Sequence, residues 1–294
     1  MTIDILMNTQ IICEMIEKNQ MEKFLPILEH LKCFDMEYLL DEKHIAKLYE
    51  LLMHNRKKEE CKEFSIFLDR NRVGSIKRMN QNLFDAQNER LQNVIKNESA
   101  DMKAILYHQA LFHREEHLLA IGETEALRII ASEEDLYRVL TVLGLDIDDL
   151  HEFTEYIRNV YQTICFDDNI ENSMKKLTAG FMVRRHEILY HLYCIHKEIP
   201  EILEKHGLLA NQAMGDKMSI RCSPERDRSI VANLLTKEAD NNQKIKCELH
   251  TKMETIGSQK PDRIYFCASV PKGIRLNGKD LSGRIYVYKI TEHT

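Results

Sequence analysis

Apolar side chains recur at spacings of three and four residues through most of the first 210 positions. Examples are Ile12, Ile16, Leu28 and Leu31, and the same spacing returns between residues 36 and 67. This is the period of amphipathic helices. Polar breaks at residues 19–20, 32–35 and 55–58 divide the pattern, so we expect about four short helices in the first seventy residues.

A polar stretch rich in Asn, Gln and Arg, residues 70–100, interrupts this pattern and predicts a loop followed by an exposed helix. The helical pattern then resumes and predicts helices at 101–120, 133–143, 147–165 and 178–206, with a candidate break before Pro200. These segments predict an N-terminal helical region, residues 1–75, and a helical bundle, residues 76–210.

The pattern changes again after residue 215. Residues 244–253 alternate, with Ile245 and Cys247 on one side and Lys246 and His250 on the other, and residues 263–268 and 284–290 alternate in the same way. Ahead of them, Ser223 and Pro224 predict the start of a helix over 224–236. The expected fold class is α+β: a mainly α-helical body with a small C-terminal antiparallel sheet, residues 216–294, packed on a helix.

Charge separates these parts as well. Residues 216–294 contain 15 lysines and arginines against ten acidic residues, whereas the whole chain carries a net charge of −6. A basic segment on an acidic body indicates a module that faces an anionic partner.

Several classes of protein are excluded or disfavoured by the sequence. No apolar run approaches the roughly 20 residues that span a bilayer, and the N-terminus lacks a basic segment, so neither a membrane partner nor a signal peptide is expected. The eight cysteines include no C-x-x-C pair, which predicts reduced thiols and a cytoplasmic location. Nucleotide-binding glycine loops and the G-x-S-x-G motif are absent. We predict no cofactor and no metal.

The expected polar face of the C-terminal sheet combines cations with tyrosines. It comprises Lys246, His250, Lys252, Arg263, Tyr265, Arg284, Tyr286 and Tyr288. Basic side chains neutralise phosphates and tyrosine rings stack on unpaired bases, so this face predicts RNA as a partner. The other interpretation is an ordinary solvated face, or one that the helical body covers. A His beside Lys and Arg can also act as a general acid or base on a phosphodiester.

The small helix-plus-sheet module resembles RelE/ParE-type bacterial toxins, many of which are ribonucleases. It also resembles C-terminal modules of uncharacterised bacterial proteins with a CExHxK…RIYF…H pattern, here residues 247–252, 263–266 and His293. This resemblance implies a catalytic or RNA-facing site. The residues it assigns to that site are His250, Lys252, Arg263, Tyr265 and His293. The other residues of the expected polar face, Lys246, Arg284, Tyr286 and Tyr288, are predicted as further contacts to nucleic acid.

Two other motifs lie in the helical body. Residues 184–191 resemble the R-x(4–6)-H motif of HEPN ribonucleases, which implies Arg185 and His191 as alternative catalytic residues, although five residues separate them where that family most often has four. His113 and His117, with Glu116 between them, follow the H-x-x-E-H order that resembles the inverzincin zinc motif. Two His and two Glu on a solvated helix face produce the same pattern, and we prefer that interpretation.

These observations lead to one functional expectation and one alternative. We expect a cytoplasmic, nucleic-acid-associated bacterial protein, a toxin-like or defence endoribonuclease that cuts RNA without metal through the C-terminal sheet face. The alternative is a non-catalytic adaptor that binds a protein partner, or itself, through the helical body.

Overall fold

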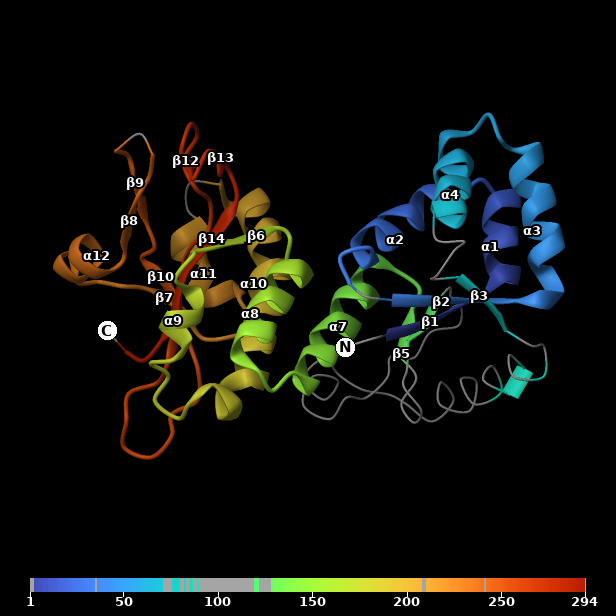
Figure 1. The fold of residues 1–294 in the computed structure, drawn as a ribbon. Coiled ribbons are helices and arrows are strands. Elements are labelled where there is room, and N and C mark those ends of the chain that lie inside the picture. The colour runs from blue at the N-terminus through green and yellow to red at the C-terminus, as the bar shows by residue number, and fades with distance from the viewer. Residues whose placement is uncertain are drawn as a thin grey trace. The chain divides into compact units, whose positions relative to one another are not determined.

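The chain forms two units in the computed structural model (Figure 1), residues 1–142 (unit 1) and residues 143–294 (unit 2). The structure describes residues 3–34, 36–70, 76–79, 82, 85–86, 89, 119–121, 128–207, 210–240 and 242–293. Each unit has its own five-stranded sheet and its own covering helices. The predicted α+β fold class is therefore confirmed.

The sheet of unit 1 has the strand order β3-β2-β1-β4-β5. Its strands are β1 (Ile3–Met7), β2 (Met36–Asp41), β3 (Ile76–Met79), β4 (Leu119–Ile121) and β5 (Arg128–Ile130). β1, β2 and β3 run parallel to one another, whereas β4 is antiparallel to β1 and β5 is antiparallel to β4.

Helices connect and cover the strands of unit 1. They are α1 (Thr9–Glu17), the 3-10 turn η1 (Met21–Lys23), α2 (Leu25–Leu31), α3 (Glu42–His54), α4 (Glu59–Arg70) and α7 (Glu133–Leu143). Asn8 begins α1 because its side chain accepts a hydrogen bond from the backbone of Ile11 at 3.2 Å. Phe24 and Phe64 are fully buried with ring centroids 5.5 Å apart in an edge-to-face arrangement, which joins η1 to α4.

The expectation of helices alone in residues 1–75 was wrong, because that region also supplies β1 and β2. Ile5, Leu6 and Met7 are all buried, so these three consecutive positions show no alternation of apolar and polar residues. A strand buried on both faces reads as a short apolar run, which periodicity cannot distinguish from a helix. Residues 76–210 are likewise not a helical bundle, because they contain β3, β4, β5 and a strand of the second sheet.

The sheet of unit 2 has the order β6-β14-β11-β10-β7. Its strands are β6 (Ile164–Phe166), β7 (Cys222–Pro224), β10 (Leu249–Lys252), β11 (Arg263–Cys267) and β14 (Ile285–Thr291). β6 is parallel to β14, and the other neighbours are antiparallel. Two ribbons complete the strands, β8 (Thr236–Glu238) with β9 (Lys244–Lys246), and β12 (Arg275–Leu276) with β13 (Lys279–Asp280).

The helices of unit 2 surround this sheet. They are α8 (Leu150–Val160), α9 (Ile170–Met174), α10 (Phe181–His206), α11 (Ala210–Lys217) and α12 (Arg228–Leu234), with the 3-10 turn η2 (Gly144–Asp146). α10 continues through Pro200, so the candidate break is not observed. α12 starts later than predicted, because Asp227 is its N-cap and accepts from the backbone of Ser229 and Ile230, while Ser223 and Pro224 lie in β7.

A buried ion cluster ties α10 to the sheet. Arg184 donates to Asp262 at 2.8 Å and to Glu187 at 2.5 Å, and all three side chains are at most 7% exposed. The second oxygen of Asp262 accepts from the backbone of Thr178, and that of Glu187 accepts from the backbone of Glu254. Because every carboxylate oxygen has a donor, the cluster fixes the helix against the sheet.

The predicted C-terminal antiparallel sheet is confirmed, but its residues belong to a larger unit. β6, which lies in the predicted helical bundle, pairs with β14, so residues 216–294 share one sheet with residues 143–215. The observed units therefore differ from the predicted ranges 1–75, 76–210 and 216–294. No helix within the described ranges has the length and apolar character that crossing a bilayer requires. None of the eight cysteines is in a disulfide.

Candidate anion-binding site

The strand register of unit 2 places four polar side chains in one row across the sheet. Ser223 lies opposite His250, His250 opposite Tyr265, and Tyr265 opposite Lys289. Two positions further along, Lys252 lies opposite Arg263 on the same face. Four of the five residues predicted as catalytic, His250, Lys252, Arg263 and Tyr265, thus share a face of the sheet, whereas His293 lies after the end of β14.

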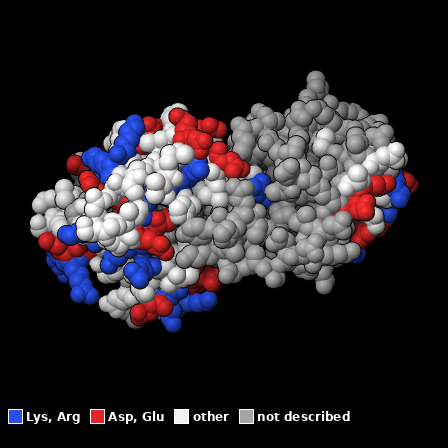
Figure 2. Space-filling view, turned by 90° about the horizontal axis from the view of Figure 1, so that it is seen from below, with Lys and Arg blue, Asp and Glu red and all other residues white. Residues whose placement is uncertain are grey.

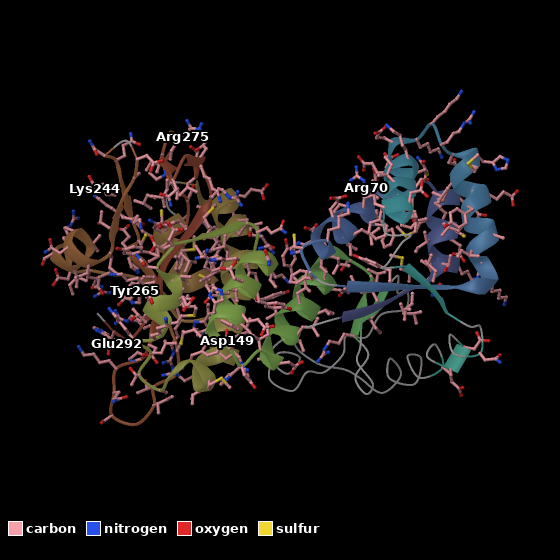
Figure 3. All side chains as sticks on the ribbon, viewed as in Figure 1. Arg70, Asp149, Lys244, Tyr265, Arg275 and Glu292 are labelled. Carbon is pink, nitrogen blue, oxygen red and sulfur yellow. The ribbon has the colours of Figure 1, made fainter. Side chains whose placement is uncertain are left out.

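Most of this face is covered. Val231 and Leu235, at the end of α12, pack against Tyr265, which is fully buried. His250 and Arg263 are only 2% and 8% exposed. An RNA-facing surface was predicted here, with a covered face as one alternative, because alternation in a strand cannot show whether a helix packs over its polar side. Figure 3 labels Tyr265 among the crowded side chains of unit 2.

The covered residues form a polar network of their own. Arg263 donates from Nη1 to Glu225 Oε2 and to Tyr265 Oη, both at 3.2 Å. His250 Nε2 lies 3.3 Å from Ser223 Oγ. Burial, followed by the nearby charges of Arg263 and Lys252, lowers the pKa of His250 from 6.5 to about 4. At neutral pH this histidine is therefore uncharged, and the network leaves two buried nitrogens, His250 Nδ1 and Arg263 Nε, without a hydrogen-bond partner among the described residues.

The predicted nucleic-acid contacts are dispersed over unit 2. Lys246 is exposed on β9, and Arg284 donates to the backbone carbonyl of Gln162. Tyr286 is buried and donates from its hydroxyl to Asp167 Oδ2 at 2.6 Å. Tyr288 is half-buried at the edge of a cavity. Tyr288 is therefore the residue of the four that lines the cavity described below.

The alternative catalytic pair occupies two different environments. Arg185 donates to the carbonyl of Ile147 and to the carboxylate of Asp148, both at 2.5 Å. His191 is buried against the sheet, with Nδ1 2.9 Å from Thr251 Oγ1. Six positions on a helix correspond to a rotation of about 240°, which explains why the two side chains serve separate contacts.

A cavity of about 450 Å³, the lysine pocket, lies beside the covered network. It is lined by Asp167, Asn169, Asn172, Ser173, Lys176, Leu234, Lys237, Tyr288, Lys289, Thr291, Glu292 and His293. These residues come from α9 and its flanks, from the end of α12, from β8 and from β14 and the residues after it. Three lysines and a histidine therefore converge from segments that are far apart in the sequence.

Asp167 neutralises part of this charge. It accepts from Lys237 Nζ at 2.7 Å, from the Tyr286 hydroxyl and from the backbone of Asn169. Burial alone would raise the pKa of Asp167, but these three hydrogen bonds hold it below its usual value. Asp167 therefore stays ionised, and its negative charge is matched by Lys237.

Lys289 forms no ion pair with any carboxylate of the described residues, although the charge of Asp167 acts on it. Its Nζ donates to the carbonyl of Leu234 at 2.6 Å and lies 4.7 Å from the centre of the Tyr288 ring. Burial, and then the positive charge of Lys176, lower the pKa of Lys289. Lys176 itself is exposed at the rim of the pocket. The two ammonium groups are thus close enough to repel each other.

A second cavity, of about 550 Å³, adjoins the first and shares Lys176, Glu292 and His293 with it. Lys175 and Lys260 add two further cations to its lining. Together the two cavities carry five lysines against the carboxylates of Asp167 and Glu292. On the face of unit 2 seen in Figure 2, positive and negative side chains are interspersed.

Sequence reasoning found part of this site and missed the rest. His293 and Tyr288 were predicted and do line the lysine pocket. Lys176, Lys237, Lys289 and Asp167 were missed, because no local pattern links positions that the fold brings together. The only sequence signal was general, the excess of lysine in the C-terminal segment.

Nothing in the described part of the chain groups three or more His, Cys, Asp or Glu side chains as a metal site would. His113, Glu116 and His117 lie outside the described residues. Comparisons with models of protein families, with curated proteins and with solved structures find no match for this chain.

Proposed function

We propose that this protein binds single-stranded RNA, and that unit 2 does so at the lysine pocket and the cavity beside it. The observation that carries the proposal is the convergence of Lys176, Lys237, Lys289 and His293 on one cavity. Lysine ammonium groups bind phosphate as point charges, and a row of them is the usual electrostatic footprint of a nucleic-acid site.

The shape of the site supports a single strand. A volume of about 450 Å³ lies within the roughly 300–1,000 Å³ that holds one small-molecule-sized group, such as a nucleotide, but not a duplex. Tyr288 adds an aromatic ring at the same cavity, and rings of this kind stack on unpaired bases. The adjoining cavity, with Lys175 and Lys260, supplies cations for the next phosphate of the strand.

A metal-independent ribonuclease is a second candidate function, favoured by the position of His293 in both cavities. Imidazole can take the proton of a ribose 2′-hydroxyl, which then attacks the adjacent phosphorus, while lysines stabilise the charge that develops. The expected products are a 2′,3′-cyclic phosphate and a 5′-hydroxyl end. His250, which the sequence placed in this role, is instead buried beside the ring of Tyr265.

The proposal is tested by titrating the full-length protein with a labelled single-stranded RNA at two salt concentrations. We expect binding that weakens with salt by a logarithmic slope of about 0.7 for each phosphate neutralised. Lys176→Gln should weaken binding, whereas the matched control Lys272→Gln, at an exposed position away from both cavities, should not.

Absence of binding at low salt would contradict the proposal and favour the non-catalytic adaptor, whose helical surfaces bind another protein or a second copy of the chain. The ribonuclease is tested in the same samples by incubation with and without EDTA. Cleavage that survives EDTA and is lost in His293→Gln supports it, and intact RNA with wild-type protein contradicts it.

A further inference from the structure

The lysine pocket carries more positive than negative charge, since three lysines line it against the carboxylates of Asp167 and Glu292. Within the described residues, neither Lys176 nor Lys289 takes part in an ion pair, whereas Lys237 is matched by Asp167. Lys289 is also half-buried, where a charge is less well solvated than at the surface. The repulsion between these two ammonium groups at one cavity is relieved by an anion that contacts both of them.

The pocket also reaches deeper than its neighbour. Three residues that line it, Asp167, Ser173 and Thr291, are themselves at most 9% exposed. The adjoining cavity is lined mostly by exposed side chains, among them Lys175, Gln259 and Lys260. A deep cavity next to a shallow one fits the end of an RNA strand. The terminal group of the RNA would lie inside the pocket, and the remaining nucleotides would lie over the shallow cavity.

A phosphate at the end of an RNA strand carries a different charge from a phosphate within the strand. An internal phosphodiester carries one negative charge, whereas a terminal phosphomonoester carries about −1.5 to −2 at pH 7 and presents three strong acceptor oxygens. A terminal phosphate can therefore pair with both Lys176 and Lys289 and still accept from His293 or from an Asn side chain of the pocket.

Resting on the proposed RNA-binding function, we propose that the lysine pocket recognises a terminal phosphomonoester of an RNA strand. Lys176 and Lys289 are the specificity-determining residues, because they supply the charge that an internal phosphate leaves unbalanced. Lys237 and Asp167 form an ion pair in the same pocket, so the negative charge of Asp167 is neutralised and does not repel the ligand.

The experiment compares three forms of one ten-nucleotide, 2′-O-methyl RNA with the same internal fluorophore. One form has hydroxyls at both ends, one carries a 5′-phosphate and one carries a 3′-phosphate. The 2′-O-methyl groups remove the nucleophile of any ribonuclease reaction, so that the ligand stays intact. Fluorescence anisotropy with the full-length protein should show about tenfold tighter binding for one phosphorylated form, as expected for added charge-assisted hydrogen bonds. The form that gains shows which end is bound.

The variants make the test specific. Lys176→Gln, at an exposed position where folding should be unaffected, is expected to abolish the preference for the phosphorylated end, and Lys272→Gln is expected to keep it. Binding of all three forms within about twofold of one another would overturn this inference and leave the RNA-binding function in place. Failure of all three forms to bind would overturn both.

Discussion

The same face of one sheet serves two different purposes in unit 2. Where α12 lies over it, His250, Arg263 and Tyr265 form a buried polar network. Next to the covered part, Lys289 and His293 line an open cavity together with Lys176 and Lys237. The two regions contain the same kinds of side chain, and only the covering helix distinguishes a structural cluster from a site that a ligand can reach.

The difference shows what a strand pattern can and cannot reveal. Alternation correctly assigned His250, Lys252, Arg263 and Tyr265 to one face. It could not show that Val231 and Leu235 would cover that face, because the covering helix is specified by a different part of the sequence. Chemistry at a polar face therefore requires accessibility as well as residue type.

The largest expected effect is a loss of stability when a residue of the covered region is changed. Tyr265→Ala should lower the free energy of unfolding by about 3–5 kcal/mol, because it removes a fully buried ring from beneath α12. Tyr265→Phe, which loses only the hydroxyl that accepts from Arg263, should cost about 1 kcal/mol. Urea unfolding followed by circular dichroism measures both, and a cost below about 1 kcal/mol for the alanine variant would show that the face is not covered.

His250 should make stability depend on pH. Its pKa in the folded protein, about 4, lies below the usual 6.5, so the unfolded state binds a proton first as the pH falls. Stability is therefore complete above pH 6.5 and is lost progressively down to pH 4, by about 3 kcal/mol for this group. Urea titrations at pH 7 and pH 4 should give a smaller difference for His250→Gln than for the wild type. Equal differences would mean that His250 titrates as an exposed residue.

Asp167 connects the two regions, since it accepts from buried Tyr286 and from Lys237 in the pocket. Asp167→Asn should lower stability by about 1–3 kcal/mol, because Lys237 loses its charge partner. The same change removes a negative charge from the pocket and should tighten RNA binding a few-fold. Thermal unfolding and RNA titration on the same sample test both effects, and weaker binding would indicate that the carboxylate contacts the ligand favourably.

Lys176 gives the smallest change in stability and a clear change in binding. Lys176→Gln at this exposed position should shift stability by less than about 0.5 kcal/mol. RNA affinity should fall about tenfold, since a charge-assisted contact to phosphate is lost. Fluorescence anisotropy and thermal unfolding test this together, with Lys272→Gln as the control. A loss of affinity that accompanies unfolding would remove the argument for a binding site.

Elements with one buried and one exposed face were predicted from the sequence, whereas the buried strand β1 was not. α7 occupies the predicted range 133–143, and α10 lies within the predicted 178–206, because amphipathic helices leave a clear period in the sequence. β1 was missed, since Ile5, Leu6 and Met7 are all buried and carry no alternation. β6 is only three residues long, and its place beside β14 depends on a pairing across more than a hundred residues.

The site was harder to predict than the fold. His293 and Tyr288 line the pocket and lie in residues 216–294, the segment whose basic charge and strand pattern predicted a nucleic-acid site. Lys176 lies just after α9, in a region that reads as helical body, and its approach to Lys289 depends on the packing of α9 on β14. Ser223 was interpreted as a helix cap and instead pairs with His250 in the sheet.

Photo-crosslinking tests most directly whether the open pocket, and not the covered face, contacts RNA. The full-length protein is irradiated with a single-stranded RNA that contains 4-thiouridine, and the modified peptides are identified by mass spectrometry. We predict crosslinks in residues 167–176 and 286–293, which line the lysine pocket, and their loss in Lys176→Gln. Crosslinks that are confined to unit 1, or to residues 244–252, would contradict the account.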